Sequence, residues 1–145
     1  MKERIAEEIQ TALRAGDRLT TETLRMLLSS IKYEEIEKRR PLSAEETAVI
    51  LARAVKTRQD AVALYEKGGR AELAEKERKE IEIVQRYLPQ PLSQDEVGKA
   101  IDEIIRELAA SSKKDLGRVM KALMARHPGR VDGRIANQIA ASRLP

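Results

Sequence analysis

Residues 89–96 divide this chain into two helical parts, and they read Pro89-Gln90-Pro91-Leu92-Ser93-Gln94-Asp95-Glu96. Both prolines lack an amide donor and restrict the residue before them, so a helix cannot pass through this stretch. Directly afterwards, Ser93 and Glu96 have the spacing of a capping box, in which each side chain binds the other residue's amide. The stretch therefore predicts one helix that ends before Pro89 and another that begins after Ser93.

Upstream of this stretch, apolar residues recur every three or four positions, which is the spacing of amphipathic helices. Thr20 or Thr21 is the expected cap of a second helix, and Ser43 with Glu46 forms the capping box of a third. Gly68-Gly69 supplies the left-handed exit that a helix end often needs. We therefore expect four helices in residues 1–90.

Downstream, the same spacing predicts three helices. The first follows Ser93, the second follows a turn at residues 111–115 and ends at His127-Pro128-Gly129, and Asp132 caps the third. No segment alternates apolar and polar residues long enough to indicate a strand. The sequence predicts an all-α protein with an N-terminal four-helix domain, residues 1–90, and a C-terminal three-helix domain, residues 91–145, joined at a Pro-x-Pro linker.

The composition excludes several kinds of site. Of the 145 residues, 36% are charged and only 2% are aromatic, so the core is built from Leu, Ile, Val, Ala and Met. The absence of cysteine excludes disulfides, thiolate zinc sites and cysteine nucleophiles. No apolar run is long enough to span a bilayer and no secretory leader is visible, so we expect a cytoplasmic protein that does not enter membranes.

The sequence singles out no catalytic centre. His127 is the only histidine and is expected in a loop, and Gly68-Gly69 lacks the strand and lysine of a phosphate-binding loop. Ser111 and Ser112 are expected to cap a helix, because no base is assigned to them. We therefore predict no catalytic residues, no cofactor and no metal.

Positive charge gathers near the C-terminus. Residues 1–92 carry 18 basic and 17 acidic side chains, whereas the chain from Ser111 onward carries 8 basic and 2 acidic ones. Lys114, Arg118 and Lys121 share one helix face, which suggests a polyanion-binding surface, although an ordinary solvated surface is the alternative. This part has no aromatic residues, so shape and phosphate contacts with a folded RNA such as tRNA are favoured over stacking on single strands.

Six segments together resemble the YqeY-like proteins, which share a domain with the B subunit of the tRNA-dependent amidotransferase. They are residues 56–61 (KTRQDA), 65–70 (YEKGGR), 83–93 (IVQRYLPQPLS), 110–124 (ASSKKDLGRVMKALM), 129–134 (GRVDGR) and 137–138 (NQ). The resemblance covers essentially the whole chain and implies an all-helical, two-part molecule. A second basic site formed by Lys56, Arg58 and Arg70 is a further hypothesis, with surface ion pairing as its alternative.

The resemblance implies a non-catalytic module that binds or recruits tRNA for aminoacylation or amidation. An adaptor for an aminoacyl-tRNA synthetase or another complex is the first alternative. Carbon–nitrogen ligase activity with glutamine as amide donor, a label inherited from the family, is the second. No DNA partner is expected. The nucleic-acid-binding residues that we expect are Lys113, Lys114, Arg118, Lys121, Arg126, Arg130, Arg134 and Asn137.

Overall fold

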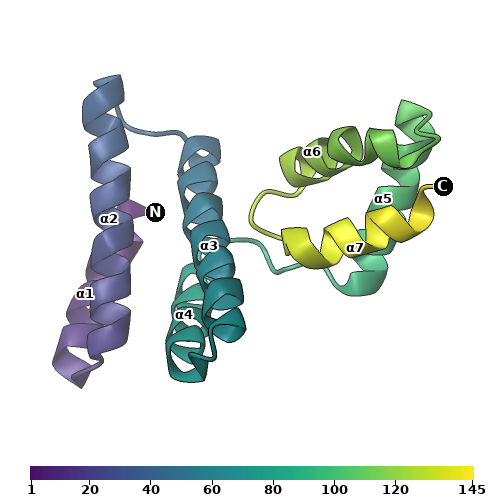
Figure 1. Ribbon diagram of the computed structural model, residues 1–145. Helices are drawn as coiled ribbons and strands as arrows, with labels where there is room; N and C mark the ends of the chain where they lie inside the picture. The colour runs from purple at the N-terminus through teal and green to yellow at the C-terminus, as the bar shows by residue number, and fades with distance from the viewer. The chain divides into compact units, whose positions relative to one another are not determined.

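The computed structural model describes residues 1–145, and every regular element in it is a helix. The chain forms seven α-helices, and a short 3₁₀ helix precedes α6. Figure 1 labels the α-helices along the chain. Their bounds are α1 Lys2–Ala15, α2 Arg18–Lys38, α3 Ala44–Lys67, α4 Ala71–Gln85, α5 Gln94–Leu108, η1 Lys113–Asp115, α6 Leu116–Arg126 and α7 Gly133–Arg143. The all-α prediction is confirmed. None of the helices is both long and apolar enough to cross a membrane.

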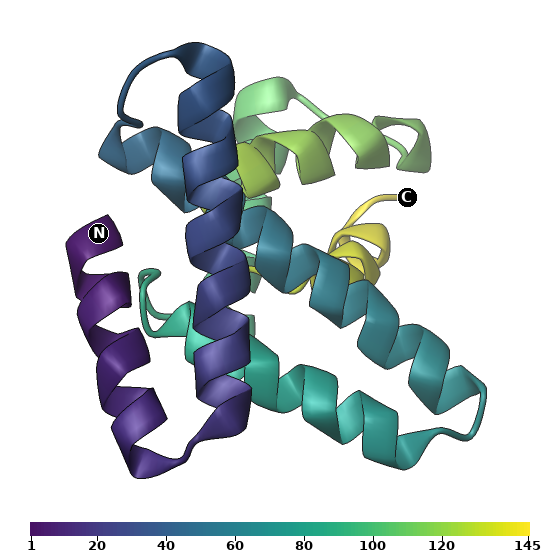
Figure 2. The same cartoon turned by 90° about the vertical axis from the view of Figure 1, so that its left-hand side faces the viewer.

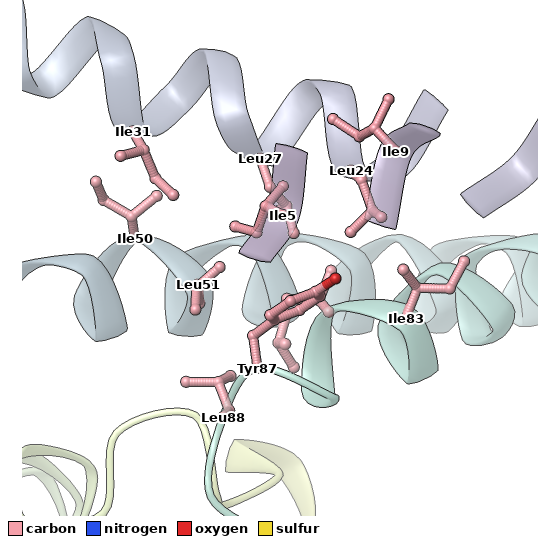
Figure 3. Close-up of a cluster of buried hydrophobic side chains, with 12 residues drawn as sticks. Ile5, Ile9, Leu24, Leu27, Ile31, Ile50, Leu51, Ile83, Tyr87 and Leu88 are labelled. Carbon is pink, nitrogen blue, oxygen red and sulfur yellow. The ribbon is translucent and has the colours of Figure 1, made fainter. Parts of the chain in front are cut away.

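The chain divides into two compact units, Met1–Pro89 and Gln90–Pro145, which we call the N-terminal and C-terminal units. In the N-terminal unit, α1 packs along α2 and α3 packs along α4, while α2 also contacts α4 (Figure 2). Leu24 and Leu27 of α2, Ile5 of α1 and Leu51 of α3 meet in a shared core (Figure 3). The two helical hairpins therefore pack as one body around aliphatic side chains.

Of the helix caps predicted for α2, α3 and α5, those of α3 and α5 are confirmed and that of α2 is not. Ser43 and Ser93 each form the predicted capping box, with Glu46 and Glu96 respectively. The expectation that Thr20 or Thr21 caps α2 is wrong, because Asp17 is the cap and its Oδ1 accepts the Thr20 amide at 3.1 Å. The helix thus begins at Arg18, earlier than expected.

In the C-terminal unit, α5, α6 and α7 pack on one another around a second aliphatic core. Ile101, Ile104, Val119 and Leu123 are fully buried there. The chain that enters this unit is held by Arg130, whose carbonyl accepts the Leu92 amide at 2.8 Å and whose Nε donates to the Gln90 carbonyl at 2.7 Å. The finer expectation, two separate domains joined by a Pro-x-Pro linker, stays a prediction.

Candidate nucleic-acid interface

Helices η1 and α6 carry three exposed positive charges that are not paired. Lys113 and Lys114 lie on η1 and Lys121 lies on α6, and all three side chains are exposed and make no ion pair. The turn below them is firmly held, because the Ser112 hydroxyl accepts the Lys114 amide and the Lys113 amide donates to the Pro145 carbonyl at 3.2 Å. The three ammonium groups are therefore presented from an ordered backbone.

Arg118 shares this face but is already paired. Its Nη2 lies 2.9 Å from Asp115 Oδ1, and its Nε lies 3.3 Å from the same oxygen. Hydrogen bonds from the Ser111 amide and from Arg118 hold the pKa of the Asp115 carboxyl below its usual range. The pair is exposed at the arginine, so it contributes little stability, but it offsets one positive charge next to the lysines.

Two further candidates are engaged in contacts within the unit. Arg126, at the end of α6, pairs with Glu107 of α5. Hydrogen bonding to Arg126 lowers the pKa of the Glu107 carboxyl. Arg130 holds the chain at Gln90, as described above. A phosphate would have to compete with these existing partners, so both side chains fit a structural role better than a free anion contact.

The start of α7 is a mixed environment for an anion. Arg134 is exposed and makes no ion pair, and Asn137 is exposed and makes no side-chain hydrogen bond. Asp132, however, caps the helix by accepting the Arg134 amide at 2.9 Å. Its carboxylate stands where a phosphate would otherwise use the free amides, which weakens the case for this helix end.

The structure thus sorts the eight expected residues into two groups. Lys113, Lys114, Lys121, Arg134 and Asn137 are free, whereas Arg118, Arg126 and Arg130 are engaged. Sequence reasoning did not include Lys99 and Arg106, which are exposed and unpaired on α5. Their i, i+7 spacing was visible, but Asp102 and Glu103 between them make that helix mixed in charge.

The second basic site suggested in the N-terminal half does not form as an exposed cluster. Arg58 is only 8% exposed and turns inward toward Glu80, with Nε 3.9 Å from Oε2. Lys56 instead pairs with Asp60 one helical turn away, at 3.3 Å. The alternative reading, ion pairing on the surface, describes Lys56, while Arg58 belongs to the interior.

The titratable groups offer little for metal chemistry. No three His, Asp or Glu side chains in residues 1–145 converge in a way that would hold a metal ion. What the C-terminal unit does offer is a set of free cations on an ordered helical surface, and that arrangement suits an anionic partner.

A family model described as "Yqey-like protein" matches residues 2–144, nearly the whole chain. The chain belongs to the YqeY-like family. This assignment confirms the resemblance seen in the six sequence segments.

Curated relatives of this YqeY-like chain come from yeasts. The protein named "Altered inheritance of mitochondria protein 41, mitochondrial" from Kluyveromyces lactis is 32% identical over 111 residues, which cover 74% of this chain and 60% of the relative. Its namesake from Lachancea thermotolerans is 31% identical over 111 residues, with 74% and 59% covered. The YqeY-like chain therefore spans about three fifths of the length of these relatives. Their printed names place those proteins in mitochondria, and the cytoplasmic location of this chain stays a prediction.

Proposed function

We propose that this YqeY-like protein is a non-catalytic tRNA-binding module, and that its RNA contact is the face formed by Lys113, Lys114 and Lys121. The observation that carries the proposal is that these three lysines are exposed and unpaired, two on the η1 turn that Ser112 caps and one on α6. The C-terminal unit, as a domain of its own, would present this face to the RNA. The link to aminoacylation or amidation is part of the same proposal and rests on the family resemblance.

Phosphate contact is the mode that these residues support. Three ammonium groups, two on η1 and one further along α6, are point charges suited to phosphates of a backbone. The C-terminal unit has no aromatic residue on which a base could stack. Recognition would therefore depend on the shape of a folded RNA and the path of its backbone, and not on base edges.

The first experiment is a salt titration of the binding of the full chain to purified tRNA. The test variant carries Lys113→Gln, Lys114→Gln and Lys121→Gln. We expect its affinity to fall at every salt concentration, and the slope of log K against log salt to become shallower by roughly 2–3, because three fewer phosphates are neutralised.

The matched control carries Lys67→Gln, Lys76→Gln and Lys79→Gln. These lysines are also exposed and unpaired, and they lie in the N-terminal unit, so the net charge changes by the same amount. The control should bind tRNA like the parent. Equal loss in both variants would mean nonspecific charge attraction, and parental binding by the test variant would show that the proposed face is wrong. An unrelated RNA duplex as competitor reports whether the protein prefers tRNA.

A further inference from the structure

An open groove lies between α2 and α3 in the N-terminal unit. Its residues are distant in sequence from Lys113, Lys114 and Lys121. Its volume is about 500 Å³. Leu27 of α2 and Ile50 and Ala54 of α3 form its apolar base, while Met26 and Tyr33 stand along the α2 side. We call it the α2–α3 groove. Figure 3 shows Leu27 and Ile50 as they reach from their helices into the core beneath it.

The α2 side of the groove exposes two large side chains. Met26 is 57% exposed and Tyr33 is 63% exposed. The chain has three aromatic residues in all, so one of them stands in solvent at this groove. Tyrosine, methionine and arginine are the residues enriched where proteins contact one another, and methionine adapts to varied apolar partners. Met26 and Tyr33 are thus of the kinds found at protein interfaces, while Ser29, Ser30 and Glu34 make the rest of the α2 side polar.

The α3 side of the groove carries two arginines, and one of them is free. Arg53 lines the groove, is exposed and makes no ion pair. Arg58 also lines it but is buried, its Nη1 donates to the Ala54 carbonyl at 3.0 Å, and its Nε lies 3.9 Å from Glu80 Oε2, so its charge is already paired. A carboxylate is the group that a free guanidinium binds best. Glu34 of α2 lines the same groove, so an acidic side chain of a partner would bind on the α3 side, at Arg53.

The geometry of the helices selects the kind of partner. Within the N-terminal unit, α2 also packs on α1 and α3 on α4, and the groove is lined by α2 and α3 alone, without a third helix of that unit. A groove between two helices is filled by the apolar face of a third, which presents side chains at i, i+3 or i+4, and i+7.

We propose that the α2–α3 groove is a docking site for an amphipathic helix of a partner protein, with apolar side chains against Met26 and Tyr33 and an acidic side chain on Arg53. This goes beyond tRNA binding, since it uses other residues in the other unit. The two proposals can be tested separately. We expect variants in the groove to keep their affinity for tRNA, and the lysine variants to keep their affinity for a docked helix.

The test begins with a display library of helical peptides selected on the full-length protein. We expect the selected peptides to share apolar residues at i, i+3 or i+4, and i+7 together with at least one Asp or Glu. Tyr33→Ser and Met26→Ser should each weaken the affinity of a selected peptide about tenfold, the size expected of a central interface residue. Both side chains are exposed, so thermal melting should show that the fold is retained.

The control is Leu64→Ser, because Leu64 is 70% exposed on α3 but does not line the groove. It should leave peptide affinity unchanged. The charge-reversed variant Arg53→Glu should no longer bind the selected peptide. It should bind a version of that peptide in which Lys replaces the acidic residue.

Three results would overturn the proposal: selection that yields no such pattern, peptides that bind the Tyr33→Ser and Arg53→Glu variants like the parent, and self-association that Tyr33→Ser abolishes. The last result would give the groove to a second copy of this chain, and sedimentation of the parent and the variant measures it directly.

Discussion

At the scale of single residues, Glu46 shows how one carboxylate joins two helices in the N-terminal unit. It accepts hydrogen bonds from Lys38, the last residue of α2, and from Arg40, which follows that helix. It also accepts one from the Ser43 amide at the start of α3. The Arg40 and Lys38 contacts, followed by the Ser43 amide, hold the pKa of the Glu46 carboxyl far below its ordinary value of 4.5. Folding therefore favours the ionised form of this residue.

The sign of the resulting pH dependence follows from that lowered pKa. The stabilising contribution of Glu46 is present above its unfolded pKa of about 4.5 and is lost as the pH falls toward the folded value. We expect Glu46→Gln to melt at a lower temperature than the parent at pH 7, and the difference to shrink steadily as the solution is acidified below 4.5. Thermal melts of both proteins across this range measure the effect, and a difference independent of pH would contradict it.

At the scale of elements, two glycines in helices of the C-terminal unit have opposite surroundings. A Cβ atom at Gly117 of α6 would meet nothing within 4 Å. A Cβ atom at Gly98 of α5 would lie 2.8 Å from Arg143 Nη2, and that guanidinium also donates to the Gly98 carbonyl at 3.0 Å. Gly117 is therefore free of any packing constraint within the unit, while Gly98 makes room for a contact between α5 and α7.

We expect Gly117→Ala to stabilise the protein by roughly 0.5–1 kcal/mol, because alanine loses less conformational entropy in a helix than glycine does. Gly98→Ala should give no such gain, since the methyl group displaces Arg143 from Gly98 and Asp102. Chemical denaturation of the two variants beside the parent is a direct comparison. Equal stabilisation by both substitutions would show that the Arg143 contact adds nothing.

The elements also show what the sequence can and cannot reveal. Ser43 and Ser93 were predictable because a capping box has a fixed spacing and a single geometry. Asp17 was not, because Asp and Thr are both good caps and the spacing does not say which of Asp17, Thr20 and Thr21 fills the role. The sequence could not predict the ion pair of Arg126 with Glu107, because the two residues are 19 positions apart and meet only when α5 packs on α6.

At the scale of the whole molecule, each unit has its own core. The N-terminal unit encloses one aliphatic cluster and the C-terminal unit another, and the two clusters share no member. The Pro-x-Pro stretch was readable as a break because proline forbids helix continuation. The sequence showed an excess of cations near the C-terminus but not that Lys113, Lys114 and Lys121 stay free while Arg126 and Arg130 are engaged. That distinction depends on tertiary neighbours.

Separate cores predict separate folding. A unit of roughly sixty residues is near the lower limit for independent stability, so the C-terminal unit gives the stricter test of separate folding. We expect residues 90–145 alone to remain helical and to melt cooperatively, because the fragment keeps its core, the Ser93 cap and the bonds of Arg130 to Gln90 and Leu92. Calorimetry of this fragment, of residues 1–89 and of the full chain measures the outcome.

A shorter fragment, residues 99–145, is the control. It lacks the Ser93 cap and Val97, so it should melt at a lower temperature or without cooperativity. If residues 90–145 show no cooperative transition, the C-terminal unit depends on the rest of the chain, and any RNA contact that it makes must be studied in the full protein.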